Sequence, residues 1–224
     1  MGKIEIIKNY INSFPELRAK KEPRKLKDKD KYEKNLKEWE IEERRKSNLR
    51  QVKHTYDNSL IGGSAFRAIR YDNIDNLLGE DTFVLGEGEG HPNFERIFNT
   101  LPEATQVVRL NINDLVKVVE VVSKAVSVTR VTISDDKILF EPKYRGEGSV
   151  FEESFNQAQL KLETEVSYFP IEFLINPTYL VSMLKFAKKL KIKELDLHYV
   201  SEIRPLLFVG VDDSNFNHII MPLR

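Results

Sequence analysis

The sequence predicts an α+β fold whose C-terminal part is one domain made of two similar halves. A strand followed by a helix occurs twice in this part of the chain, about 60 residues apart, and short apolar strands follow each copy. A strand-helix-strand-strand-strand unit that occurs twice indicates a single core shared by two halves. We therefore expect the helices on one face of the domain and the sheets on the other.

Charge separates the start of the chain from the rest. Residues 1–50 carry 16 Lys and Arg against 10 Asp and Glu, whereas residues 51–224 carry 19 against 25, although the whole chain has no net charge. A basic arm of this kind can contact phosphate groups. Its bases are interspersed with acids, however, and a mixed run more often forms a solvated helix face. Both interpretations stay open from the sequence.

Two helices are expected in this arm. The first has apolar residues at helical spacing: Ile4, Ile7, Tyr10, Ile11 and Phe14. The second covers residues 29–50, which lack glycine and proline. The helix has a thin, largely apolar stripe at three-to-four spacing, which predicts a surface helix: Tyr32, Leu36, Trp39 and Glu43. Pro15 and Pro23 bracket the stretch before it.

From residue 51 onward the pattern changes to that of a strand. Apolar alternation at Phe66 and Ala68 predicts a short strand, with turns expected on either side at residues 57–58 and 62–63. The glycine-rich GEGEG at residues 86–90 is acidic and lacks the lysine of a phosphate-binding loop. We interpret it as a connector.

The two strand-helix copies have matching helix starts. In the first copy, VVRLNINDLVKVVEVVSKA, the strand contains Leu110, and Asn113 with Asp114 begins the helix. Its buried face should hold Leu115, Val118, Val119 and Val122. In the second, IEFLINPTYLVSMLKFAKK, Asn176 is the expected N-cap before Pro177. Its buried face should hold Leu180, Met183, Leu184 and Ala187. The strands that follow are TRVTISD and KILFEPK, then ELDLHYV, PLLFVGVD and HIIMPLR.

The inventory of reactive side chains favours a binding protein over an enzyme. The four histidines lack metal-ligand spacing, cysteine is absent, and no serine has a nucleophile-elbow setting. The acid pairs at residues 135–136 and 212–213 lie between predicted strands, where acids are ordinary turn residues. We therefore expect no catalytic residue, no metal and no cofactor. No apolar run approaches the ~18 residues of a membrane span, so we expect a cytoplasmic protein without membrane attachment.

Four motifs carry a resemblance to a known family. They are HPNFERIF (residues 91–98), INPTYLVSMLKF (175–186), HIIMPLR (218–224) and, more weakly, SAFRAI (64–69). From about residue 60 onward, the chain resembles the bacterial DNA polymerase III beta subunit, the DNA sliding clamp. Its short length would fit a divergent member from a phage or mobile element.

The resemblance implies the DNA clamp fold and three regions along the chain. These are a basic, mixed-charge helical region (1–50), a partial clamp-like β region with a connector (51–100) and a complete clamp-like domain (101–224). Only 21 residues separate Ile69 from His91, too few for the half-domain that the family has there. Residues 15–50 have no counterpart in the family.

The resemblance further implies a non-enzymatic, ring-shaped homo-oligomer. It would act as a processivity factor that encircles double-stranded DNA without reading its sequence. The DNA-binding residues would be lysines on and after the two helices: Lys117, Lys124, Lys185, Lys188, Lys189 and Lys191. Lysines at the C-terminal end of a helix also compensate the helix dipole, which is an equal alternative for them.

An apolar pocket for peptides of the DNA polymerase and the clamp loader is also implied. Its residues would be Phe66, Arg67, Ala68, Pro92, Arg96, Ile97, Ile219, Met221, Pro222 and Leu223, with Arg67 or Arg96 at the rim. The alternative is that Ile219 and Met221 are simply inward residues of a terminal strand. A rival function is a clamp-derived interaction module that binds a replication protein without forming a ring.

Overall fold

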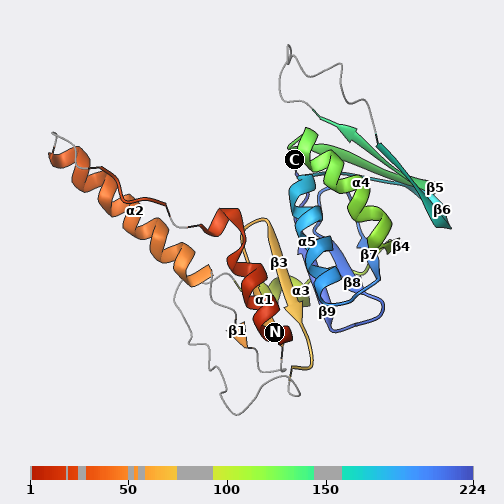
Figure 1. Ribbon diagram of the computed structural model, residues 1–224, viewed down its shortest axis with the longest axis horizontal. Coiled ribbons are helices and arrows are strands. Elements are labelled where there is room, and N and C mark those ends of the chain that lie inside the picture. Colours follow the sequence, from red (N-terminus) through yellow and green to blue (C-terminus); the bar gives the residue numbers. More distant parts are fainter. Residues whose placement is uncertain are drawn as a thin grey trace. The chain divides into compact units, whose positions relative to one another are not determined.

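The computed structural model describes residues 2–18, 20–24, 29–49, 53–54, 59–74, 93–143 and 158–223. The contacts within the chain divide it into two compact units, Met1–Asn99 (unit 1) and Thr100–Arg224 (unit 2). Each unit contains both helices and strands (Figure 1).

Unit 1 consists of helices and an antiparallel sheet. Its elements are α1 (Lys3–Asn12), the 3-10 helix η1 (Pro15–Leu17), α2 (Lys29–Leu49), β1 (Lys53–His54), β2 (Leu60–Gly63), β3 (Arg67–Tyr71) and α3 (Phe94–Asn99). β2 pairs with β1 on one side and with β3 on the other. The helices expected at the start of the chain and over residues 29–50 are both present.

Close packing around β2 explains its two glycines, since Gly62 faces α1 and Gly63 faces the backbone of β3. The segment from α1 to η1 buries Ile7, Tyr10, Ile11, Phe14 and Leu17. A Cβ atom on Gly62 would lie 2.5 Å from Cδ1 of Ile11, so a larger residue would have to displace the buried Ile11 side chain. The turn expected at residues 62–63 is therefore not found, because both glycines end β2 and pair with β3.

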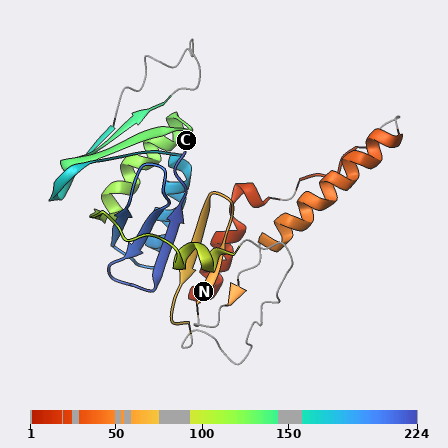
Figure 2. The ribbon, with the colours of Figure 1, turned by 180° about the vertical axis from the view of Figure 1, so that it is seen from behind.

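Unit 2 contains the two predicted strand-helix copies. Its elements are β4 (Gln106–Asn111), α4 (Ile112–Ala125), β5 (Thr129–Pro142), β6 (Ala158–Ile175), α5 (Pro177–Lys189), β7 (Glu194–Tyr199), β8 (Leu206–Gly210) and β9 (Phe216–Ile220). β4, β7, β8 and β9 pair in the order β9-β8-β7-β4, and β5 pairs with β6. All these pairings are antiparallel. Figure 2 shows β7, β8 and β9 side by side.

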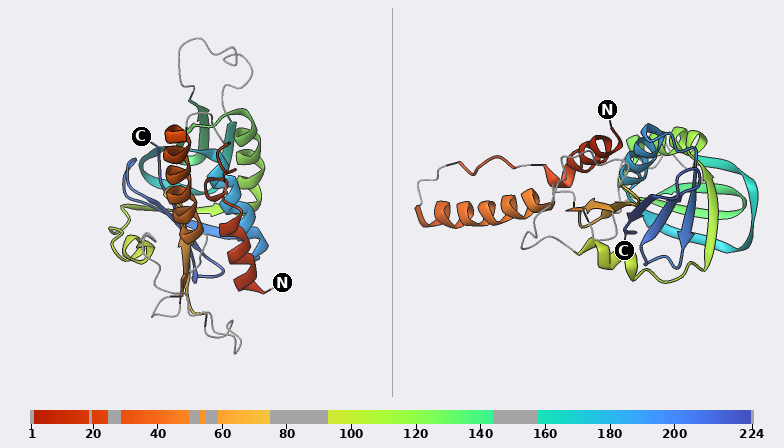
Figure 3. Two further views of the ribbon diagram at one scale, coloured as in Figure 1. Left: turned by 90° about the vertical axis from the view of Figure 1, so that its left-hand side faces the viewer. Right: turned by 90° about the horizontal axis from the view of Figure 1, so that it is seen from below.

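The two helices of unit 2 lie next to each other on one face, and the strands lie on the other (Figure 3). The predicted buried face of α5 is confirmed, and α4 buries Ile112, Leu115, Val116, Val119 and Val122. Val118 is only half-buried. Each buried Val or Leu stabilises the fold by ~1.5–3 kcal/mol relative to exposure, so these faces hold the helices on the sheets. The predicted α+β architecture is confirmed.

Two local expectations differ from the structure. α4 begins at Ile112 rather than at Asn113, because the side chain of Asn111 accepts hydrogen bonds from the backbone N–H groups of Asn113 (3.0 Å) and Asp114 (3.4 Å). The acids at residues 135–136 do not form a turn. They lie within β5, where the pairing with β6 changes register on both sides of Asp135.

Candidate nucleic-acid interface and peptide pocket

The candidate DNA-binding lysines lie on a pair of adjacent helices, except Lys191, which lies just beyond the second. An ion pair joins α4 to α5, with Nζ of Lys185 2.6 Å from Oε1 of Glu120. Each helix is capped by an asparagine: Asn111 before α4, and Asn176 before α5, which accepts from the N–H of Thr178 at 2.9 Å. The two caps fix where the helices begin.

The exposed face of α4 is close to neutral. Lys117 and Lys124 are both exposed, but Nζ of Lys117 lies 3.2 Å from Oδ1 of Asp114. Glu120 supplies a second acid on the same helix. Hydrogen bonding by Lys185 lowers the pKa of Glu120, so this carboxylate stays charged at neutral pH and offsets Lys185. Neither Lys117 nor Lys185 therefore presents a full uncompensated charge.

Positive charge is instead concentrated at the end of α5. This helix contains no acidic residue, and Lys188 and Lys189 are exposed in its last turn. Lys191 and Lys193, just beyond the helix, are exposed as well. The backbone N–H of Lys193 donates to Oδ2 of Asp212 at 2.9 Å. Lysines 188, 189 and 191 thus form the most basic part of the predicted interface.

The helix stop places Lys191 in an unusual backbone conformation. The N–H of Lys191 donates to the carbonyl of Lys188 (3.0 Å), and that of Ile192 to Ala187 (3.1 Å), which is the Schellman pattern. Lys191 has φ of 66°, the left-handed region in which glycine is usual. A side chain with Cβ costs roughly 1–2 kcal/mol there. A charged residue is held at this position despite that strain.

The pocket residues of unit 2 follow one another at the end of β9. Ile219 is 1% exposed, which fits an inward residue of the strand, whereas Met221, Pro222 and Leu223 are half-buried. The N–H of Leu223 donates to the carbonyl of Leu174 at 2.8 Å and ties the last residues to β6. These three side chains therefore offer apolar surface on an ordered backbone.

The pocket residues of unit 1 are split between surface and core. Phe66 and Ile97 are 43% and 37% exposed, and Arg96 is exposed on α3. Ala68 is buried in β3. Pro92 lies outside the described residues, as does His91 of the same motif.

Arg67 occupies a different place from the rim expected for it. The side chain is 1% exposed, and its Nε and Nη2 donate to the two carboxylate oxygens of Glu16 at 3.0 and 3.2 Å. Its guanidinium lies 3.7 Å from the ring centroid of Phe14. Oγ of Ser64 donates to the same Glu16 at 2.8 Å. The sequence offered no signal for this cluster, because Glu16 and Phe14 lie where the resemblance has no counterpart.

Comparisons with known proteins identify the fold. No family model matches the chain, and no curated protein matches its sequence. Solved structures do match. The Helicobacter pylori beta clamp with 3,4-difluorobenzamide has a TM-score of 0.67 at 11% identity, covering 100% of this chain and 64% of that one. The fold is that of a bacterial sliding clamp.

Further clamps agree with this assignment. The Helicobacter pylori beta clamp with diflunisal has a TM-score of 0.60 at 14% identity, covering 79% of this chain and 59% of that one. The Pseudomonas aeruginosa DNA polymerase sliding clamp has a TM-score of 0.58 at 12% identity, covering 77% and 57%. The chain therefore spans about three fifths of the length of the clamps it matches. The resemblance found in the motifs is confirmed for the fold.

The described residues contain neither a metal-ligand cluster nor a helix that could span a membrane. Among them, no three His, Asp or Glu side chains come together as metal ligands would. No helix in this part of the chain is both long and apolar enough to cross a bilayer.

Proposed function

We propose that the protein is a DNA sliding clamp, a non-enzymatic processivity factor that encircles duplex DNA and tethers a polymerase through short peptides. The observation that carries this proposal is the pair α4 and α5, which lie side by side on one face of a clamp fold and end in exposed lysines. Lysines on a helical surface bind phosphates without reading bases, as a sliding protein requires.

The strand edges of unit 2 support assembly into a ring. β5 and β6 are 14 and 18 residues long and, among the described residues, pair only with each other. β4 pairs only with β7 in this part of the chain, and its Val107 is 52% exposed. Long open edges tend to pair with another chain. A closed ring of identical subunits would satisfy them.

Native mass spectrometry at micromolar protein and low salt tests the ring. We expect a closed oligomer whose mass is a whole multiple of the 26.1 kDa subunit. Once assembled on DNA, it should remain on a nicked circle and leave when the circle is cut. A monomer under these conditions would exclude the ring.

The alternative is a clamp-derived interaction module that never closes. One observation favours it: Arg67 is paired with Glu16 inside unit 1 rather than placed at the pocket rim that the resemblance implies. Such a module would be monomeric and would still bind a replication protein through the surface around Met221 and Leu223. The native mass distinguishes the two functions directly.

Removing two side chains tests the peptide pocket, which both functions use. We expect Met221→Ala with Leu223→Ala to weaken binding of a polymerase-derived peptide with leucine and phenylalanine anchors by ~2 kcal/mol or more, because large-to-small truncation removes apolar contacts. Calorimetry gives the affinity. Ile203→Ala, which truncates an isoleucine 53% exposed elsewhere in unit 2, should leave binding unchanged. A folded double variant with wild-type affinity would remove the pocket from both proposals.

A further inference from the structure

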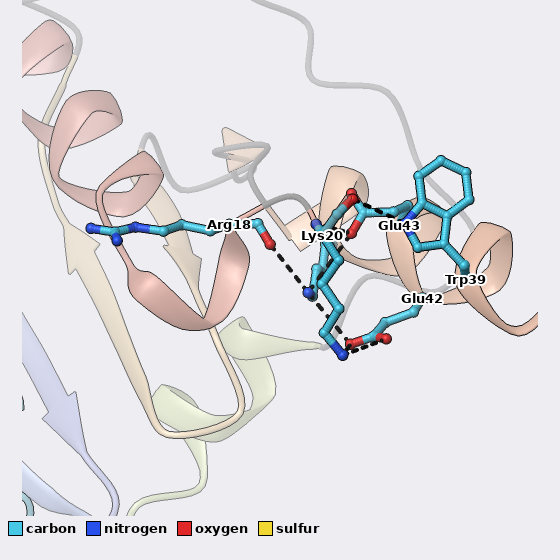
Figure 4. Close-up of polar contacts among 6 residues, drawn as sticks. Arg18, Lys20, Trp39, Glu42 and Glu43 are labelled. Carbon is cyan, nitrogen blue, oxygen red and sulfur yellow. Dashed lines mark hydrogen bonds and ion pairs between the residues drawn. The ribbon is translucent and has the colours of Figure 1, made fainter. Parts of the chain in front are cut away.

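α2 sorts its charges onto two faces. Arg18 and Lys20, in the segment that precedes it, make polar contacts with one face of this helix (Figure 4). The N–H of Lys20 donates to Oε1 of Glu43 at 2.8 Å, and its Nζ donates to Oε2 of Glu42 at 2.9 Å. Nε1 of Trp39 donates to the carbonyl of Lys20 at 3.0 Å.

On this contacted face, lysine side chains offset the charges of the acids. Nζ of Lys46 lies 3.4 Å from Glu42 and 3.8 Å from Glu43, and also donates to the carbonyl of Arg18 at 3.1 Å. Hydrogen bonding by Lys20 lowers the pKa of Glu42, which keeps that carboxylate ionised beside its cations. The acids of the last two turns of α2 are therefore offset within unit 1.

The opposite face is rich in exposed cations. At 100° per residue, five basic residues fall on one side of the helix: Lys31, Lys34, Lys37, Arg44 and Arg45. All five are exposed. Asp30 and Glu38 are the acids within the arc that these five residues span, so this arc carries a net charge of +3, with Glu33 and Glu40 along one of its borders. We call these five residues the basic face.

We propose that the basic face of α2 binds the phosphate backbone of duplex DNA, outside the interface formed by α4 and α5. From residue 31 to residue 45 the face is ~21 Å long, at 1.5 Å per residue. Phosphates of one strand are spaced ~3.4 Å apart, so it can follow about six of them. This inference rests on the proposed function, which brings DNA to the protein.

The distribution of apolar residues favours DNA over a membrane as the polyanion. An interfacial helix inserts an apolar face next to its cations. In α2, Tyr32, Leu36 and Trp39 are half-buried and share a stripe with Glu43, on the side that Lys20 contacts. Among the residues of α2 whose side chains the structure describes, only Ile41, 69% exposed, lies among the cations. One isoleucine is too little apolar surface to anchor a helix in lipid.

Neutralising three cations of this face tests the inference. The variant is Lys34→Gln with Lys37→Gln and Arg45→Gln, since glutamine preserves helix propensity. Binding to a 30-base-pair linear duplex is followed by fluorescence anisotropy over a range of salt concentrations. We expect affinity at about 0.1 M salt to fall about tenfold or more, and the salt slope to decrease by about 2 to 3, because each lost phosphate contact lowers it by ~0.9.

A matched control removes the same charge elsewhere. Lys143→Gln with Lys161→Gln and Arg204→Gln alters three exposed cations of unit 2 and should reduce affinity by less than about twofold. Equal losses in the two variants would overturn the assignment. So would unchanged DNA binding together with lost binding to anionic phospholipid vesicles, which would assign the face to membranes.

The same assay separates this inference from the proposed function. A third variant, Lys188→Gln with Lys189→Gln, weakens the interface on α5. If that variant loses affinity while the α2 variant matches its control, only the further inference fails. If the wild-type chain itself does not bind the duplex, both fail. Circular dichroism of each variant confirms that helix content is retained.

Discussion

Replacing Glu16 by alanine should lower the free energy of unfolding of unit 1 by about 3 kcal/mol. The substitution leaves the guanidinium of Arg67 buried without its carboxylate, and breaking one side of a buried pair typically costs ~3–5 kcal/mol. Glu16 is 16% exposed, so the loss should lie at the lower end. Trp39, the single tryptophan, lies in unit 1 and gives a fluorescence signal for its denaturant unfolding.

Two further variants define what this loss means. Glu22→Ala removes an exposed carboxylate nearby and should change stability by less than about 0.5 kcal/mol. Glu16→Leu with Arg67→Met replaces the whole pair by apolar side chains and should recover most of the loss. A Glu16→Ala protein as stable as Glu22→Ala would show that the pair contributes nothing to unit 1.

Reversing the charges at the end of α5 should abolish retention on circular DNA. The variant is Lys188→Glu with Lys189→Glu and Lys191→Glu, and we expect affinity for duplex DNA to fall by about a hundredfold or more at about 0.1 M salt, since each phosphate contact depends strongly on salt. Lys185 is kept, because Glu120 already offsets its charge. Gel filtration of the protein with nicked circular plasmid measures retention.

The alternative role of these lysines makes a different prediction. If they only compensate the helix dipole, reversal should lower stability by ~0.3–1 kcal/mol for each residue and leave DNA retention intact. Lys143→Glu with Lys161→Glu and Arg204→Glu changes the net charge equally and should retain DNA. Retention by the α5 variant at the level of this control would remove α5 from the interface.

The fold could be predicted wherever local pattern and tertiary packing agree. Asn176 and Pro177 mark a helix start by side-chain and backbone chemistry that needs no partner, and the apolar faces of α4 and α5 follow the helical period. The doubled order of strand and helix then indicated the architecture. Gly62 was misjudged because its role depends on Ile11, about fifty residues earlier.

The candidate site was less predictable for the same reason. Arg67 has the sequence neighbours of a pocket residue, but its position is decided by Glu16 and Phe14, and no local pattern links them. The sequence points to the candidate lysines of unit 2, but it does not indicate which of their charges are offset by nearby acids. Only the structure reveals that acids on α4 offset Lys117 and Lys185 while the end of α5 has none.

At Lys191, the left-handed backbone favours glycine for stability, whereas binding of a polyanion favours a positively charged side chain. Glycine at this position would relieve the Cβ strain of ~1–2 kcal/mol. Its larger conformational entropy in the unfolded chain would cancel only part of that gain in stability. Laboratory selection for heat tolerance alone should therefore drive this codon toward glycine. Selection for polyanion binding should hold it at lysine or arginine. The residue that homologues carry at this helix stop would then record which of the two pressures each lineage experienced.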